Sequence, residues 1–135
     1  MTDFNQTIIE EFRANEGKVA AFPGAPVVLI TTKGAKSGQT RVNPLVGQIA
    51  DDGAFYVFAS KAGAPNNPDW YYNLLAHPDI EVEFGTDRYS ATATLITGAD
   101  RDRIYDRQKE LMPQFADYEA STTRIIPVIA LTRKG

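Results

Sequence analysis

Residues 27–59 have the sequence VVLITTKGAKSGQTRVNPLVGQIADDGAFYVFA, which contains three runs of β-branched and aromatic residues separated by two turns. Runs of this kind are typical of strands, so we expect strands over residues 27–32, 42–50 and 54–59. The second turn, Asp51-Asp-Gly53, has the composition of a hairpin connection. This region therefore predicts an antiparallel sheet joined by short turns.

The rest of the chain supplies three further strands. Residues 80–84 and 89–95 alternate apolar and polar side chains, which predicts a hairpin with one buried face and with Glu81 and Glu83 on the solvated face. A last strand is expected over residues 127–132. Six strands with mainly hairpin connections predict an α+β, mainly β fold: a closed or nearly closed six-stranded antiparallel barrel with peripheral helices. At 135 residues, the chain should form a single domain.

Three helices are expected around this barrel. Residues 2–16 carry apolar side chains at helical spacing, namely Phe4, Ile8, Ile9 and Phe12. This predicts an amphipathic helix that is either packed on the domain or loosely attached to it. A second helix should begin at the N-cap Asn67 and last to about Ala76.

The third helix should begin at the N-cap Asp100, with Arg101 and its charged neighbours on the solvated face. Its expected inner side consists of Ile104, Tyr105, Gln108, Leu111, Met112 and Phe115.

The composition excludes several classes of function. A pI of about 5.1 argues against nucleic-acid binding, and no apolar run approaches the ~20 residues that span a bilayer. The chain has no cysteine, which excludes disulfides and thiolate chemistry. His77 is the single histidine and precedes a proline at an expected helix end, so we expect a structural role for it and no metal site. The N-terminus lacks the layout of a signal peptide, and a cytoplasmic protein whose chemistry is carried by a cofactor fits best.

The first turn, Gly34-Ala-Lys-Ser-Gly-Gln-Thr-Arg41, combines glycines, hydroxyls and cations. Between Glu16 and Asp51 there is no acidic residue, and four cations give this window a charge of +4, whereas the rest of the chain sums to −7. A local positive site on an acidic protein favours a discrete anionic small molecule. The turn is not a P-loop, because that motif requires glycine where Ala35 and Ile30 stand and a helix afterwards.

Three cations can form an anion site if their turns open at one end of the barrel. Lys36 and Arg41 lie in the first turn, and Lys61 follows the third strand. Together with Ser37 and Ser60 they would suit a phosphate or several carboxylates. The same residues are also compatible with an exposed polar turn that carries ordinary surface cations, and the spacing alone does not decide between the two.

The chain resembles the deazaflavin-dependent nitroreductase family, whose members use the reduced deazaflavin coenzyme F420. The resemblance covers about residues 26–128. It rests on residues 34–45, GAKSGQTRVNPL, on residues 59–71, ASKAGAPNNPDWY, and on residues 118–127. It implies a split β-barrel related to the flavin-mononucleotide-binding oxidases.

The resemblance also implies roles for individual residues. The implied coenzyme contacts are Lys36, Ser37, Arg41, Asn43, Pro44, Leu45, Ser60, Lys61 and Trp70. The three cations, helped by Ser37, would hold the phosphate and acidic tail. Backbone of residues 43–45 would lie along the ring system, and Ser60 and Trp70 would border the reactive ring. Tyr118 resembles the tyrosine of a mobile segment that closes over the substrate, and Tyr118 or Ser60, or a water held by one of them, would supply a proton.

The activity implied by the resemblance is hydride transfer from reduced F420 to a small-molecule acceptor: an enone or other activated double bond, a quinone or a nitroaromatic compound. Val46 stands where nitroimidazole-reducing members carry a tyrosine, which argues against nitro-drug activation, and Ala35 replaces an arginine common in the family. The alternatives are a coenzyme carrier without turnover and a barrel protein that binds haem or FMN, with FMN less expected than F420. Related barrels frequently form homodimers, but no residue in the sequence decides this.

Overall fold

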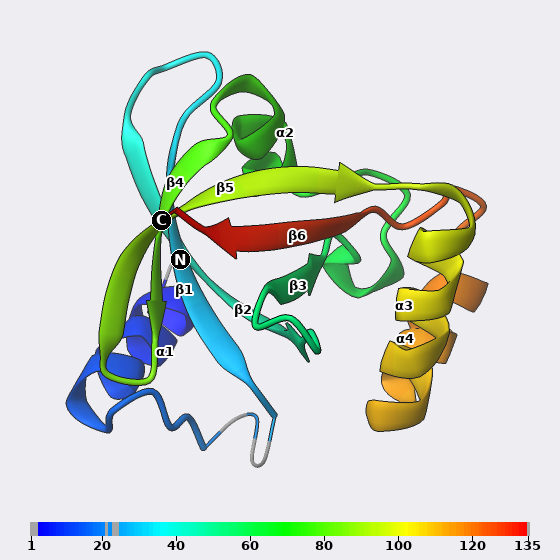
Figure 1. Cartoon of the computed structure of the whole chain (residues 1–135), viewed down its shortest axis with the longest axis horizontal. Coiled ribbons are helices and arrows are strands. Elements are labelled where there is room, and N and C mark those ends of the chain that lie inside the picture. Colours follow the sequence, from blue (N-terminus) through cyan, green and yellow to red (C-terminus); the bar gives the residue numbers. More distant parts are fainter. Residues whose placement is uncertain (1–2, 21, 23–24, 135) are drawn as a thin grey trace.

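The computed structural model describes the chain except for residues 1–2, 21, 23–24 and 135. Its strands form one closed antiparallel barrel in the order β1-β2-β3-β6-β5-β4 (Figure 1). Their bounds are β1 Val27–Lys33, β2 Thr40–Ile49, β3 Phe55–Phe58, β4 Asp79–Phe84, β5 Asp87–Ile96 and β6 Val128–Arg133. The expected six-stranded barrel is therefore confirmed, and each predicted strand is present with small shifts at its ends.

The helices lie at the periphery of this barrel (Figure 1). Their bounds are α1 Asp3–Ala14, the short 3-10 helix η1 Lys61–Gly63, α2 Asp69–Ala76, α3 Gly98–Leu111 and α4 Gln114–Ala120. Helix α2 lies near one end of the barrel, whereas α3 and α4 lie side by side beyond the ends of β5 and β6. Both the cation-bearing turn and the β3–α2 loop meet at α2, and this arrangement positions the site.

Strand β2 is held on its two edges to different extents. It pairs with β1 along its first seven residues, from Lys33↔Thr40 to Val27↔Val46, which is why β2 begins two residues before the expected start. It pairs with β3 only over Gly47–Ile49. Pro44, which has no N–H to donate, is tolerated because the edge of β2 facing away from β1 has no strand partner there among the described residues. Residues 42–45 along this open edge form one wall of a cavity.

The barrel interior is filled by side chains from every strand. Its buried core includes Val28, Ile30, Val57, Val82 and Ile129, each at most 2% exposed. Alternation along the strands directs these residues inward. Gly47 permits the close approach of β2 to β3, because a Cβ there would lie 2.2 Å from both the Phe55 ring and the Tyr56 carbonyl oxygen.

Helix α1 packs on the barrel, which settles whether it is attached. Ile8, Ile9 and Phe12 are buried against β1. Arg13, at the end of α1, donates two hydrogen bonds to the Glu83 carboxylate, at 3.1 and 2.8 Å. The prediction that Glu83 lies on a freely solvated face is therefore wrong, because Arg13 covers it. The side chain of Phe4 lies outside the described residues.

Helix α3 differs from its prediction at both ends. Its N-cap is Thr97 rather than Asp100, and Asp100 instead pairs with Arg103 at 2.9 Å. The helix ends at Leu111, which is 56% exposed, so the predicted apolar face is too long. Phe115 belongs to the separate helix α4, which starts directly after Pro113.

Two exposure predictions near α3 are also wrong. Arg101 was expected on the solvated face but is buried, because its Nε donates to the Ile126 carbonyl oxygen at 3.0 Å. Leu95 is the last apolar residue of the alternating run 89–95, whose apolar side chains were expected on one buried face, but it is 40% exposed. Arg101 lies where α3 meets the segment before β6, a contact that local sequence patterns do not report.

Candidate functional site

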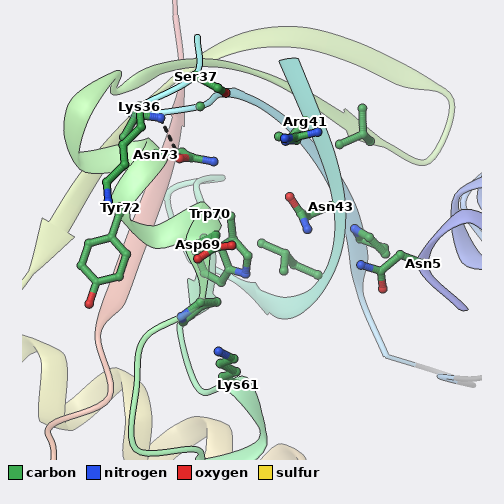
Figure 2. Close-up of a pocket in the computed structure, with 16 residues that line it drawn as sticks. Asn5, Lys36, Ser37, Arg41, Asn43, Lys61, Asp69, Trp70, Tyr72 and Asn73 are labelled. Atoms are coloured by element: carbon green, nitrogen blue, oxygen red, sulfur yellow. Dashed lines mark hydrogen bonds between the residues drawn. The ribbon is translucent and has the colours of Figure 1, made fainter. Parts of the chain in front are cut away.

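A cavity of about 990 Å³ opens between the β1–β2 turn, the open edge of β2 and the start of α2 (Figure 2). Figure 2 shows Lys36, Ser37 and Arg41 on one side of this space, Lys61 reaching in from the opposite side, and Trp70 between them. The full lining is Asn5, Gly34, Ala35, Lys36, Ser37, Arg41, Val42, Asn43, Pro44, Leu45, Lys61, Pro68, Asp69, Trp70, Tyr72 and Asn73. We call it the cationic cavity.

The β1–β2 turn is held by its own backbone. The Gly34 N–H donates to the Gln39 carbonyl at 2.8 Å, and the Gly38 N–H donates to the Gly34 carbonyl at 3.0 Å. Gly38 has a φ of +72°, a left-handed conformation that favours glycine. The Ser37 hydroxyl accepts a hydrogen bond from the Gln39 N–H at 3.1 Å. The turn is therefore an organised loop that presents Lys36 and Ser37 at a defined place on the cavity rim.

Asn73 fastens this turn to helix α2, a role that sequence reasoning missed. Its side-chain oxygen accepts a hydrogen bond from the Ala35 N–H at 2.9 Å, drawn as a dashed line in Figure 2. Its side-chain nitrogen donates to the Thr32 hydroxyl at 3.4 Å. Asn73 is 8% exposed and lies one turn from Trp70 on the buried side of α2. The available signal in the sequence was a polar residue, Asn73, at a position on the buried side of α2 where an apolar residue would be expected.

Three cations, Lys36, Arg41 and Lys61, are among the residues that line this one cavity. Lys36, Arg41 and Lys61 are exposed, and none of them takes part in an ion pair among the residues that the structure describes. Among the described residues that line the cavity, Asp69 is the one carboxylate, so the cavity carries a local excess of positive charge. An anion with more than one negative group is the ligand that such a lining favours.

A second cavity, of about 220 Å³, adjoins the first and shares four lining residues with it: Pro44, Leu45, Lys61 and Trp70. Its other walls are mainly apolar and consist of Phe22, Val46, Phe58, Ser60, Met112, Gln114, Phe115 and Tyr118. We call it the apolar chamber. Both predicted proton donors, Ser60 and Tyr118, line this chamber, and the ring of Tyr118 packs edge-on against Phe115 at 5.1 Å.

Helix α4, which carries Tyr118, is anchored on two sides. The Tyr105 hydroxyl donates to the Phe115 carbonyl oxygen at 2.8 Å, and burial raises the pKa of Tyr105 to about 12, so this donor stays protonated. On the other side, Gly63 lies so close to α4 that a Cβ there would meet the Tyr118 carbonyl oxygen at 2.9 Å. These contacts hold Tyr118 beside the loop that carries Ser60 and Lys61.

The predicted N-cap of α2, Asn67, has a different role. Helix α2 begins at Asp69 after Pro68, whose side chain makes no capping hydrogen bond. The Asn67 side-chain oxygen instead accepts a hydrogen bond from Arg124 Nη1 at 2.7 Å, so it is not available to the helix N–H groups. His77 terminates α2 with its N–H bonded to the Asn73 carbonyl and does not line either cavity, in keeping with a structural role.

Two further findings bear on the kind of site. Within the described part of the chain, no group of three or more acidic or histidine side chains is arranged to hold a metal ion. None of the helices described in the structure is long and apolar enough to cross a membrane.

The fold and the paired cavities define a barrel protein with a cation-lined cavity next to an apolar chamber. A family model described as F420H(2)-dependent quinone reductase matches residues 5–133. The chain is 36% identical over 130 residues to an F420H(2)-dependent quinone reductase of Mycobacterium tuberculosis, covering 91% of this chain and 85% of that protein. It belongs to the F420H(2)-dependent quinone reductase family, and coenzyme F420 is therefore its cofactor.

Solved structures agree with this assignment. The structure of an F420-H2 dependent reductase, FDR-A, superposes with a TM-score of 0.70 at 37% identity, covering 78% of this chain and 93% of that one. A second structure, described as a domain-swapped dimer, superposes with a TM-score of 0.72 at 34% identity and covers 96% and 98% of the two chains. The resemblance inferred from the sequence is thereby confirmed, and the chain is an F420-dependent reductase.

Proposed function

We propose that this chain transfers a hydride from reduced coenzyme F420 to a small uncharged acceptor with an activated double bond, and that quinones are the preferred acceptors. The observation that carries the proposal is the junction of the two cavities at Pro44, Leu45, Lys61 and Trp70. A cofactor whose tail lies in the cationic cavity and whose ring lies at this junction faces the apolar chamber directly. Donor and acceptor are then held in contact, which is the main contribution a protein makes to such a reaction.

The residues present fit the coenzyme. Lys36, Arg41 and Lys61 would bind its phosphate and acidic tail, because charge-assisted hydrogen bonds to phosphate and carboxylate are strong. Residues 43–45 line the cavity at the open edge of β2, and a flat ring system would lie against their backbone. Trp70, which is buried apart from its cavity-facing side, would border the ring.

When bound, the reduced coenzyme supplies two electrons as a hydride. The protein then has three tasks. Phe22, Phe58 and Phe115 exclude water from the apolar chamber. Van der Waals contact with these walls orients a flat, uncharged acceptor. A hydroxyl of Tyr118 or Ser60, or a water bound to one of them, delivers the proton that accompanies the hydride to the acceptor.

The chamber favours quinones and enones over nitro compounds. Val46 forms part of its wall, so the chamber lacks the tyrosine that the resemblance places at this position in nitroimidazole-reducing members. The polar groups that remain are the hydroxyls of Ser60 and Tyr118, the amide of Gln114 and the ammonium group of Lys61. The two hydroxyls can donate hydrogen bonds to the two carbonyl oxygens of a quinone, which takes up one hydride and one proton on reduction to the hydroquinone.

A substrate panel tests the proposal. Purified protein with reduced F420 should oxidise the coenzyme on addition of a naphthoquinone, more slowly with an enone and slowest with a nitroaromatic compound, followed by the coenzyme absorbance. Binding of F420 without oxidation by any acceptor would support the alternative, a coenzyme carrier without turnover. FMN should bind more weakly than F420, because it lacks the acidic tail that the three cations require.

A further inference from the structure

Arg124 makes an unusual set of contacts with the loop between β3 and α2. Its Nε donates to the Ala64 carbonyl oxygen at 3.0 Å, and its Nη2 donates to the Ser60 carbonyl oxygen at 2.9 Å. Its Nη1 donates to the Ala59 carbonyl oxygen at 3.1 Å and to the side-chain oxygen of Asn67 at 2.7 Å. One guanidinium group therefore binds four points of this loop, all within the nine residues from Ala59 to Asn67.

All four acceptors are neutral, and no carboxylate pairs with Arg124 among the residues described in the structure. Arg124 is only partly exposed, so its charge is partly removed from water. A desolvated cation is costly unless its donors are satisfied. The oxygen atoms of this loop accept hydrogen bonds from the Arg124 donors. The arginine therefore stabilises the loop conformation, and the loop in turn stabilises the partly buried arginine.

The loop held in this way carries residues of both cavities. Ser60 lines the apolar chamber, and Lys61 lines both cavities. Trp70, the second residue of α2, follows the loop and also lines both cavities. Lys61 has a φ of +46°, a left-handed conformation that a residue with a side chain rarely adopts. Arg124 binds carbonyl oxygens on both sides of Lys61, at Ser60 and Ala64, and so braces the strained residue.

We propose that Arg124 is a positioning residue, whose guanidinium group holds the β3–α2 loop in the conformation that aims Lys61 into the cationic cavity and places Ser60 on the wall of the apolar chamber. The part of this inference that concerns catalysis rests on the proposed function. The part that concerns loop conformation does not. Arg124 itself lines neither cavity, so it acts through the residues it holds.

The test uses the single tryptophan as a local probe. Trp70 lines both cavities next to the loop, so quenching of its fluorescence by acrylamide reports loop packing without any coenzyme. We compare Arg124→Gln and Arg124→Lys with Arg103→Gln, a matched control that removes an exposed charge on α3. The second readout is F420 affinity by titration, and the third is the KM for reduced coenzyme relative to kcat.

We expect stronger quenching of Trp70 and about tenfold weaker F420 binding in Arg124→Gln, the loss expected when Lys61 no longer makes its charged hydrogen bond to the coenzyme. Arg124→Lys, which keeps the charge but cannot reach four acceptors, should be intermediate. In Arg124→Ala, added guanidinium ion at low concentration should restore the quenching of Trp70 toward that of the unmodified protein.

Unchanged Trp70 quenching in both Arg124→Gln and Arg124→Lys would overturn the proposal. Lower thermal stability with no change in quenching or in F420 affinity would overturn it as well, since the role would then be merely structural. If Arg124→Gln does not fold, Arg124→Lys and the guanidinium experiment decide the question. If the unmodified protein binds no F420, the proposed function fails, while the quenching data still test the loop role of Arg124.

Discussion

The side-chain oxygen of Asn73 accepts a hydrogen bond from the Ala35 N–H at 2.9 Å, which joins helix α2 to the β1–β2 turn. The same helix carries Trp70, its second residue, at the wall of the cavity, so one element organises both the turn and the aromatic wall. A displacement of α2 would therefore move the anion-binding turn and the ring-facing residue together.

Replacement of Asn73 by alanine should destabilise the protein and weaken coenzyme binding. The change leaves the Ala35 N–H and the Thr32 hydroxyl without their buried partner, which typically costs about 1–3 kcal/mol. Denaturant unfolding and F420 titration measure the two effects. Asn66→Ala is the control, because Asn66 is exposed in the loop before α2. Equal stability of the two variants would contradict the anchoring role.

Lys36→Ala and Arg41→Ala should each weaken F420 binding by about 1–3 kcal/mol, the value of a hydrogen bond to a charged group. The loss should shrink as salt is added, because the contacts are electrostatic and partly exposed. Lys33→Ala removes the same charge at an exposed position of β1 outside the cavity lining. If both cavity variants matched this control in titrations at low salt, the tail site would be elsewhere.

Gly63→Ala and Gly53→Ala form a matched pair, because the two glycines have φ values of +82° and +90°. A Cβ on Gly53 would meet nothing within 4 Å, so this variant should lose only about 1–2 kcal/mol for the left-handed conformation. A Cβ on Gly63 would lie 2.8 Å from Ser121 Cβ and 2.9 Å from the Tyr118 carbonyl oxygen. Gly63→Ala should therefore be less stable and should also raise the KM for the acceptor, which steady-state kinetics measure. If Gly63→Ala left the KM for the acceptor unchanged, α4 would not contribute to the acceptor site.

Tyr118→Phe and Ser60→Ala distinguish the two candidate proton donors. Tyr118→Phe keeps the ring contact with Phe115 at 5.1 Å and should keep the stability of the protein. Whichever of the two variants removes the proton donor should have a kcat about a hundredfold lower, with little change in F420 affinity. General acid catalysis by a positioned side chain typically raises the rate by at least about a hundredfold. Full kcat in both variants would assign proton delivery to water alone.

Glu83→Gln should show a pH-dependent loss of stability. The hydrogen bonds from Arg13 lower the pKa of Glu83 below its ordinary value of 4.5, and they outweigh the opposite effect of burial. A carboxyl whose pKa is lower in the folded state stabilises the protein above pH of about 4.5, and this contribution is lost as the pH falls through the folded-state pKa.

Because Arg13 is half exposed, the expected cost of Glu83→Gln at pH 7 is only about 0.5–1 kcal/mol. Urea unfolding at pH 7 and at pH 3 should show the difference from the unmodified protein shrinking at the lower pH. Glu10→Gln, an exposed change on the helix that carries Arg13, serves as the control. A difference that persisted at pH 3 would mean that the ion pair is not its source.

Local patterns were sufficient for the strands and for the residues of the cationic cavity. Strand alternation and hairpin turns depend on neighbours in the sequence, so β1, β2 and β3 could be predicted to within a few residues. Lys36, Arg41 and Lys61 could be singled out because they stand in turns, where side chains are exposed and backbone groups are available. Helix ends were predicted less well, since Asn67 and Asp100 have suitable side chains but use them in other contacts.

The sequence alone determined the antiparallel barrel, the local excess of positive charge and the resemblance to F420-dependent enzymes, because each depends on residue types at short spacing. Only the tertiary structure decided how the site is held together. Arg124 reaches carbonyl oxygens about sixty positions earlier, and Asn73 reaches back to Ala35. Such contacts form between segments that meet only when the barrel closes, and a carbonyl or N–H partner is present at every residue, so the sequence carries no mark of which one will be used.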